Sequence, residues 1–229
     1  MSFYNKAKIP KSEDEPKTPY NTYWFHSISR LESQSKIPQR DYIKIVSIDP
    51  ANKTFSIRTE ARYSDGRVVP VIFDIWDIRT PPNVDPDYPD ENRANLFRKL
   101  DEIRKYIIDA NIVLIERQIP LNVKSRNIMC ATIDYFGLVL RDSPYFPIIL
   151  DIDPKLKGKM LNSGRLSKYE LKQWAVVRSK EILGLNNDSW SIQRLEEHKK
   201  KADDLADCVV QLEAFLIYTK HPLATKGLY

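Results

Sequence analysis

The sequence predicts an α/β domain whose mixed, five-stranded sheet begins with three antiparallel strands and continues with parallel strands. Alternating apolar and polar residues on either side of a tight turn predict the antiparallel part. Further along the chain, short apolar segments alternate with segments whose apolar residues recur at helical spacing, which is typical of parallel strands joined by helices. The expected element order is β-β-β-α-β-α-β-α-α.

The composition fits one such domain. The chain has 229 residues, of which 42% are hydrophobic, enough for one well-cored domain and a terminal extension. Cys130 and Cys208 lie far apart and outside any CxxC pair, which argues against a disulfide framework and a thiolate zinc site. No apolar run approaches the roughly 20 residues of a membrane helix, and no signal-peptide pattern is seen. We expect a soluble protein of a reducing intracellular compartment, without a membrane partner.

The N-terminal residues are predicted to lie outside the domain. Residues 1–19 are rich in lysine, proline and acids and have little to bury, which is typical of disorder. Residues 20–40 contain four aromatic side chains that suit docking either on the domain or on a partner. We expect a partly disordered extension over residues 1–40, a domain over 41–220 and a tail over 221–229.

Three segments predict the antiparallel strands. "YIKIVSID" (42–49) is apolar and ends at Asp49, and "TFSIRTEARY" (54–63) alternates as a half-buried strand does. An SDG turn then leads into "RVVPVIFDIWDI" (67–78). Pro70 lies inside this third strand, where it removes a backbone donor from the ladder. The third strand is therefore predicted at the edge of the sheet.

The later elements follow from apolar spacing. Leucine and isoleucine recur at helical spacing over residues 93–110, and helices are also expected at about 122–140 and 167–183. "NIVLIERQIP" (111–120) and "FPIILDID" (146–153) are predicted as buried strands. The apolar end of "HKKKADDLADCVVQLEAFLIY" predicts the last helix.

Acidic residues occur where two of these strands end. Asp49 closes the first strand, and Glu116 follows apolar residues in the fourth. Parallel strands bring their carboxyl ends to one edge of a sheet, where the sites of α/β proteins usually lie. A carboxylate in an apolar strand is costly unless it is paired or bound to a metal. Lys44 and Arg117 are possible partners of Glu116, although strand alternation directs Arg117 to the opposite face.

Three more acids open the last helix. The simpler interpretation is that Asp203, Asp204 and Asp207 stabilise the helix start by capping it. Asp204 and Asp207, three residues apart, project from one helix face, and Asp203 with Asp207 is the alternative pair. If this helix begins beside the strand ends, four carboxylates converge, and two divalent cations would neutralise their repulsion. Oxygen ligands favour Mg²⁺ or Mn²⁺ over zinc.

The order of these acids resembles the ribonuclease H-like superfamily and, within it, the RuvC-type Holliday junction resolvases. The segments "SIDPANKTFSI", "IVLIERQIPLNVKSRN" and "KKKADDLADCVVQ" are most similar to the branch found in poxviruses and other large DNA viruses, and the resemblance covers residues 42–219. Asp49, Glu116, Asp204 and Asp207 match the family's metal-binding acids. The resemblance implies a ribonuclease H-like fold, with its third strand at an edge, and two Mg²⁺ (or Mn²⁺) ions per active site.

The resemblance also implies an activity. The protein would be an endonuclease that resolves four-way DNA junctions by paired symmetric cuts during recombination, replication or repair, leaving 5′-phosphate ends. If it is viral, it would act where viral DNA replicates in the host cell. Two alternatives are another ribonuclease H-like nuclease, acting on RNA–DNA hybrids or flaps, and a non-catalytic junction-binding protein. The complete set of acids argues against the second.

A basic cluster follows the fifth strand. The chain carries a net charge of +5, and residues 155–180 hold eight basic residues with Glu170 as their only acid. Such a cluster binds phosphates through counterion release. The segment is therefore predicted to contact DNA.

The family resemblance implies a catalytic lysine in this segment, near the scissile phosphate. Lys155, Lys157 and Lys159 all qualify, and we favour Lys157. Lys155, Lys159, Lys168 and, outside the cluster, Lys124 are expected to bind DNA.

The helix expected at about 122–140 has more apolar residues than one sheet face needs. In RuvC-type proteins the matching helix forms a dimer interface, and two symmetric cuts require two symmetric sites. We expect a homodimer, while the simpler interpretation is that this helix only covers the sheet. The apolar set is Ile128, Met129, Thr132, Ile133, Phe136 and Leu140.

Overall fold

A computed structural model describes residues 40–79, 91–145 and 147–228 of the chain. The predicted N-terminal extension, except for its last residue, lies outside the described residues. Within the described ranges, no helix is both long and apolar enough to cross a membrane.

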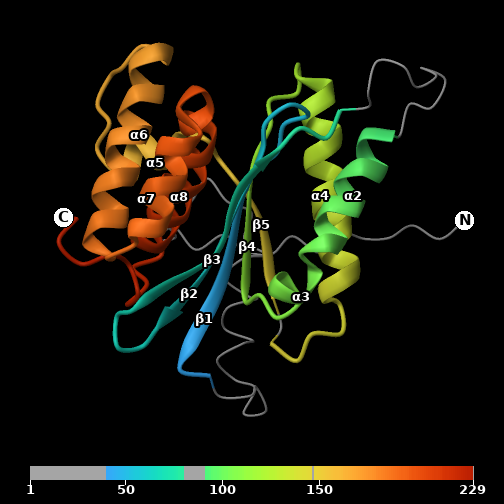
Figure 1. The fold of residues 1–229 in the computed structure, drawn as a ribbon, viewed down its shortest axis with the longest axis horizontal. Helices are drawn as coiled ribbons and strands as arrows, with labels where there is room; N and C mark the ends of the chain where they lie inside the picture. The colour runs from blue at the N-terminus through green and yellow to red at the C-terminus, as the bar shows by residue number, and fades with distance from the viewer. Residues whose placement is uncertain (1–39, 80–90, 146, 229) are drawn as a thin grey trace, which may run out of the picture. The chain divides into compact units, whose positions relative to one another are not determined.

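The described chain is built around a five-stranded mixed sheet with the strand order β3-β2-β1-β4-β5 (Figure 1). β1 pairs antiparallel with β2 and parallel with β4, and β4 pairs parallel with β5. The strands are β1 (Tyr42–Asp49), β2 (Phe55–Tyr63), β3 (Val68–Trp76), β4 (Ile112–Glu116) and β5 (Ile148–Ile152). The predicted five-stranded mixed sheet, antiparallel first and then parallel, is confirmed.

β3 lies at the edge of the sheet, as Pro70 predicted. Pro70 faces Glu60 of β2, and the register shifts between Thr59 and Glu60. A proline cannot donate a ladder hydrogen bond, so an edge strand with a local irregularity is where it is tolerated.

Helices cover both faces of the sheet (Figure 1). One face carries α2 (Glu91–Glu102) and α4 (Val123–Leu140), with α3 (Arg104–Ile107) after α2. The other face carries the remaining elements. These are α5 (Lys155–Met160), α6 (Lys168–Leu185), α7 (Ser189–Glu197), the 3₁₀ helix η1 (Lys199–Lys201) and α8 (Ala202–Tyr218).

Three helical details differ from the prediction. The helix expected over residues 93–110 is divided into α2 and α3, and α5 and α7 were not predicted. α5 has only six residues, too few for an apolar period to show. α7 has nine residues, and one of its two buried side chains, Ser191, is polar and accepts a hydrogen bond from buried Arg58.

The apolar side chains of α4 are directed into the core. All of the six named above except Ile133 are buried, and Ile133 is half-buried against the same core cluster. They pack with the sheet and α2, which accounts for their number without a second apolar surface. The exposed apolar side chains of α4 include Val123 and Leu138.

Charged side chains are buried where β2 faces α7 and α8. Arg58, Glu60 and Arg62 alternate along β2, so they share one face of the sheet, and each is at most 2% exposed. Glu60 accepts hydrogen bonds from both arginines, at 2.5 Å from Arg58 Nε and 2.6 Å from Arg62 Nε. Burial alone would raise the pKa of Glu60, but Arg62 and Arg58 lower it to about 2. Glu60 is therefore ionised at neutral pH.

This charge network extends from β2 into the helices. Arg58 donates to Asp188, the N-cap residue of α7, at 2.8 Å, and Arg62 donates to Glu213 of α8 at 2.8 Å. Glu213 also accepts from the backbone N–H and the hydroxyl of buried Thr225, at 2.6 and 2.8 Å. The residues after α8 are thus attached to the same network.

Replacing Arg62 with methionine should lower the free energy of unfolding by about 3–5 kcal/mol, because Glu60 and Glu213 would each lose a buried partner. Urea unfolding measures this value. Arg67→Met is the matched control, since Arg67 pairs with Asp65 on the exposed β2–β3 turn and should contribute little. Equal losses in the two variants would contradict a stabilising role for the network.

Candidate active site

Asp49 and Glu116 end neighbouring strands. β1 and β4 run parallel, and Ile48 pairs with Ile115, so the next residue on each strand is one of these acids. Both carboxylates therefore lie at the carboxyl edge of the sheet, as the sequence predicted.

The start of α8 brings more carboxylates to this edge. α8 packs across β1, β2 and β4, and the charges of Glu116, Asp207 and Asp204 all act on Asp49. Part of Asp49 reaches solvent, but protein surrounds its carboxyl group. This burial, together with the charges of Glu116 and Asp207, raises the pKa of Asp49 well above its usual value. Asp49 thus lies in a site that disfavours its negative charge unless a cation is near.

Lys157 supplies one such cation. Its Nζ lies 2.8 Å from Glu116 Oε2 and 2.7 Å from Asp207 Oδ1, and its side chain is 8% exposed. Burial alone would lower the pKa of Lys157, but Asp207 and Glu116 raise it well above its usual value. The lysine is therefore charged. The partners that the sequence allowed for Glu116 are engaged elsewhere, since Lys44 pairs with Asp109 and Arg117 with Asp151.

The structure separates the roles of Asp203 and Asp204. Asp203 forms an ion pair with Lys172 of α6. Asp204 is half-buried, and burial together with the charge of Asp203 raises its pKa. The charge of Asp204 raises the pKa of Asp49, and the charge of Asp207 raises the pKa of Asp204. Asp204 therefore belongs with the acid cluster. The N-cap residue of α8 is Lys201, whose side chain makes no capping hydrogen bond, and Asp203 and Asp204 lie in the first turn of the helix.

Solved structures with this arrangement of strands and helices are known. The yeast mitochondrial Holliday junction resolvase Ydc2 matches with a TM-score of 0.56 at 17% identity, over 84% of this chain and 86% of that one. The chain has the fold of the RuvC-type resolvases. RuvC of T. thermophilus in complex with a Holliday junction substrate matches with a TM-score of 0.52 at 14% identity, over 80% of this chain and 99% of that one.

A poxvirus protein shares this RuvC-type fold. The Fowlpox virus resolvase, in complex with substrate Holliday junction DNA, matches with a TM-score of 0.50 at 14% identity, over 78% of this chain and 99% of that one. The predicted resemblance is thereby confirmed at the level of the fold. No protein-family model and no curated protein matches the sequence.

The donors at this candidate site suit a hard divalent cation. Asp49, Glu116, Asp204 and Asp207 offer only carboxylate oxygens, the ligands that Mg²⁺ and Mn²⁺ prefer. Their side chains do not form a ready set of metal ligands: among the described residues, no three acidic, histidine or cysteine side chains are placed to hold an ion. Lys157 Nζ lies between two of the four carboxylates. The chemistry of the donors fits a metal, and the ammonium of Lys157 is in contact with part of the set.

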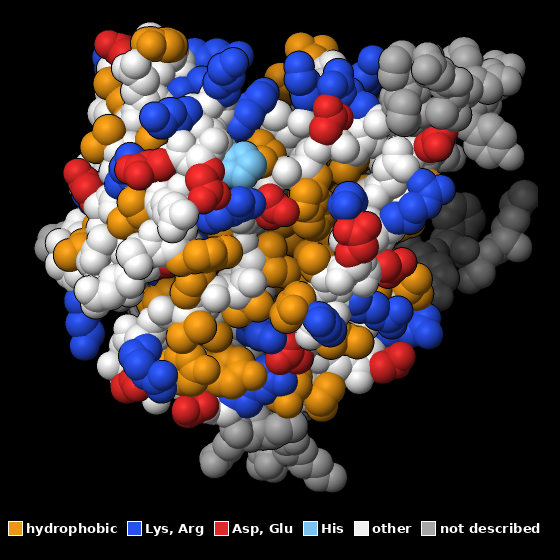
Figure 2. Space-filling view, viewed as in Figure 1, with side chains coloured by type: hydrophobic (Ala, Val, Ile, Leu, Met, Phe, Trp, Pro, Cys, Tyr) orange, Lys and Arg blue, Asp and Glu red, His pale blue; other side chains and the backbone are white. Residues whose placement is uncertain are grey.

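Basic side chains surround this end of the sheet. Lys155, Lys159, Lys168 and Lys124 are all exposed, as DNA contacts must be. Lys168 is the first residue of α6, whose start is fixed by a capping box between Ser167 and Glu170. Figure 2 shows Lys and Arg side chains gathered at the top of the view, the end at which β1 and β4 finish in Figure 1.

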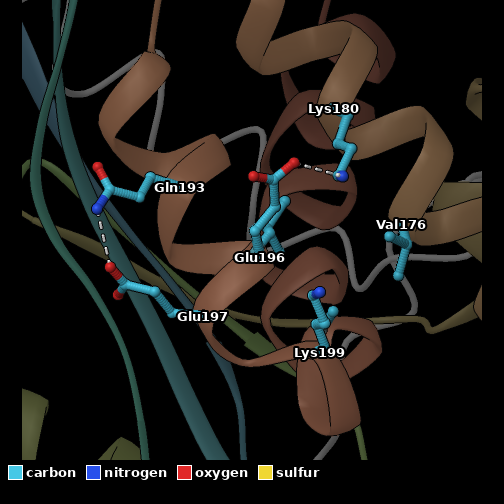
Figure 3. Close-up of a pocket in the computed structure, with 8 residues that line it drawn as sticks. Val176, Lys180, Gln193, Glu196, Glu197 and Lys199 are labelled. Atoms are coloured by element: carbon cyan, nitrogen blue, oxygen red, sulfur yellow. Dashed lines mark hydrogen bonds and ion pairs between the residues drawn. The ribbon is translucent and has the colours of Figure 1, made fainter.

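A cavity of about 670 Å³ lies apart from the acids, between α6, α7 and the start of α8. Its lining has charges of both signs, including an ion pair of 3.1 Å between Lys180 and Glu196 (Figure 3). None of the four candidate metal ligands is among its described lining residues. The acid cluster is therefore not part of this cavity.

Gln211 is a site-positioning residue that the sequence patterns did not indicate. Its side-chain amide is buried one helical turn after Asp207 and donates to Ser47 Oγ at 3.1 Å, Ile48 O at 3.3 Å and Leu114 O at 3.4 Å. These hydrogen bonds connect α8 to both strands that carry acids. The sequence feature that could have indicated Gln211 is its position as a single amide within the apolar run "CVVQL".

Asp49→Asn should stabilise the metal-free protein, because it removes a buried charge that neighbouring carboxylates repel. A carboxyl whose pKa is raised by folding lowers stability as the pH rises from its unfolded value, about 4, through its folded value. The advantage of the variant should therefore be small at pH 4 and grow toward neutral pH. Urea unfolding in EDTA across this range measures it. Asp142→Asn, at an 87% exposed carboxylate, is the control, and a pH-independent difference for Asp49→Asn would contradict the assignment.

Proposed function

We propose that the protein is a metal-dependent DNA endonuclease that resolves four-way junctions by paired symmetric cuts. The observation that carries this proposal is the set of four acids at the carboxyl ends of β1 and β4 and the start of α8. The fold shared with junction resolvases from yeast, a bacterium and a poxvirus supports it.

The acids would hold the metal. Asp49, Glu116, Asp204 and Asp207 provide the oxygen ligands for two Mg²⁺ or Mn²⁺ ions. Such ions supply an activated water and stabilise the departing 3′ oxygen in phosphodiester hydrolysis, which leaves a 5′ phosphate. Lys157 is the basic side chain that the structure brings to the acids, so it is the lysine that we assign to the scissile phosphate.

Exposed lysines near the acids would bind the DNA backbone. Lys155 and Lys159 lie on α5 on either side of Lys157, and Lys168 begins α6. Lys124 lies in the first turn of α4, which follows Glu116 after a short loop. Contacts with phosphates position the DNA without reading its sequence, which suits an enzyme that selects a branched shape.

Two symmetric cuts require two active sites related by a twofold axis, so we infer a homodimer. In α4 the exposed Val123 and Leu138 are apolar side chains available for that contact. The three sequence segments that resemble the large-DNA-virus branch favour an enzyme of viral recombination, replication or repair, acting inside the host cell.

Cleavage of a labelled four-way DNA junction in the presence of Mg²⁺ is the direct test. Asp49→Asn, Glu116→Gln, Asp204→Asn and Asp207→Asn should each lower cleavage by orders of magnitude, because each removes a charged metal ligand. Junction binding should survive, since removing a carboxylate lessens the repulsion of phosphates.

Asp203→Asn is the matched control for this cleavage test, because Asp203 lies in the same helical turn but pairs with Lys172. We expect it to retain most activity. Strong loss at Asp203 with none at Asp204 would move the metal site by one residue. Cleavage of an RNA–DNA hybrid in preference to the junction would replace the proposed function.

Replacing both Lys155 and Lys159 with alanine should weaken junction binding and make it less dependent on salt. Each lost phosphate contact reduces the slope of log K against log salt by roughly 0.9, so the double variant should lose about 2. Fluorescence anisotropy over a series of salt concentrations measures the slope. Lys99→Ala with Lys105→Ala, on α2 and α3, is the control for net charge, and an equal change there would remove α5 from the DNA path.

A further inference from the structure

The carboxylates of the acid cluster repel one another. Four carboxylates act on one another at the strand ends, and Asp49 is surrounded by protein. Repulsion within such a group opposes folding unless a cation reduces it. In the metal-free protein, a positive charge of the chain itself is needed to hold these side chains together.

Lys157 is placed to do this. Its ammonium bridges Glu116 of β4 and Asp207 of α8, at 2.8 and 2.7 Å, and so connects two of the three elements that carry the acids. The other lysine bonded to an acid at the start of α8, Lys172, contacts Asp203. Among the ion pairs of the described residues, those of Glu116 and Asp207 are both made by Lys157.

The backbone around Lys157 is fixed while its side chain can change direction. Leu156 and Leu161, on either side of Lys157, are buried, and α5 packs against α8. Lysine carries its charge on a flexible four-carbon stem, so the ammonium can leave the carboxylates without movement of α5.

A metal ion and the ammonium compete for the same oxygens. A divalent cation held by Glu116 and Asp207 would need the negative charge that Lys157 Nζ now neutralises. At the short distances of metal coordination, a positive ammonium between the same two carboxylates would be strongly repelled.

We propose that Lys157 is a resident counter-ion that holds Glu116 and Asp207 together in the metal-free protein and is expelled when the metal binds. This inference rests on the proposed metal site and adds a sequence of events to it. Loading of the metal would release the ammonium from these two carboxylates and leave it free to contact a DNA phosphate. The lysine therefore becomes available to the substrate only in the metal-loaded protein.

Chemical acetylation of lysines, followed by mass spectrometry, tests this exchange in the full-length protein without DNA. Lys157 should be protected in EDTA, because it is buried and ion-paired, and its acetylation rate should rise about tenfold or more with Mg²⁺ or Mn²⁺. Lys155 and Lys159 are exposed neighbours on the same helix and serve as internal controls, whose rates should change little. In Asp49→Asn, which lacks a metal ligand but keeps both partners of Lys157, metal should no longer unmask Lys157.

A second variant tests the competition directly. Lys157→Met keeps an apolar stem but removes the charge, so Mn²⁺ should bind at least about tenfold more tightly by calorimetry. The metal-free variant should also unfold at a lower temperature than the wild-type protein. Glu116→Gln should raise the acetylation of Lys157 even in EDTA, because it removes one of the two carboxylates that hold the ammonium.

The outcomes separate this inference from the proposed function. If metal binds while Lys157 stays as protected as in EDTA, the inference is wrong and the nuclease assignment stands. If metal unmasks Lys157 in a protein that does not cut junctions, the exchange is supported and the proposed function fails. Absence of any metal binding to the wild-type protein would overturn both.

Discussion

The position of α8 on the sheet is the constraint on which the site depends. Asp204 and Asp207 reach Asp49 and Glu116 only if α8 begins beside the ends of β1 and β4. An α-helix rises about 5.4 Å per turn, so a slip of one turn would separate the acids. Apolar packing alone permits such slips, because leucines and valines tolerate several registers. Hydrogen bonds from buried polar groups do not permit such slips. Gln211 donates hydrogen bonds to β1 and β4, and Glu213 accepts one from Arg62 of β2.

The same face of the sheet carries two groups of charges in different states. Around Glu60, two arginines and three carboxylates are buried, and each has a hydrogen-bonded partner of opposite charge. Around Asp49, Lys157 forms ion pairs with two of the four carboxylates, Glu116 and Asp207, while Lys172 and Lys201 act on Asp204. The first group is nearly neutral and strengthens the attachment of α7, α8 and the C-terminal segment. The group around Asp49 keeps an excess of negative charge, and this excess favours the binding of a cation.

The fold and the site support the function to different degrees. At 14–17% identity, the likeness to yeast, bacterial and poxvirus resolvases extends over most of the chain and shows the fold. A fold can host several activities, so the activity has to be argued from the site. Here the site adds acids at adjacent strand ends, a buried lysine between two of them and exposed lysines nearby, a combination suited to the hydrolysis of a phosphate backbone.

The sequence by itself determined the features that depend on near neighbours in the chain. Apolar alternation predicts the strands, Pro70 predicts the edge, and the order of Asp49, Glu116 and the aspartates of α8 predicts the acids of the site. The tertiary structure decided the features that join distant residues. Glu116 and Lys157 are 41 positions apart, and Arg62 and Glu213 are 151 apart, so no local pattern indicates either pair. The tertiary structure also decided that Asp204, and not Asp203, belongs to the acid cluster. It decided as well that most of the apolar residues of α4 pack in the core. The physical reason is that pairing and burial depend on which elements pack together, whereas periodicity records only which side of an element faces inward.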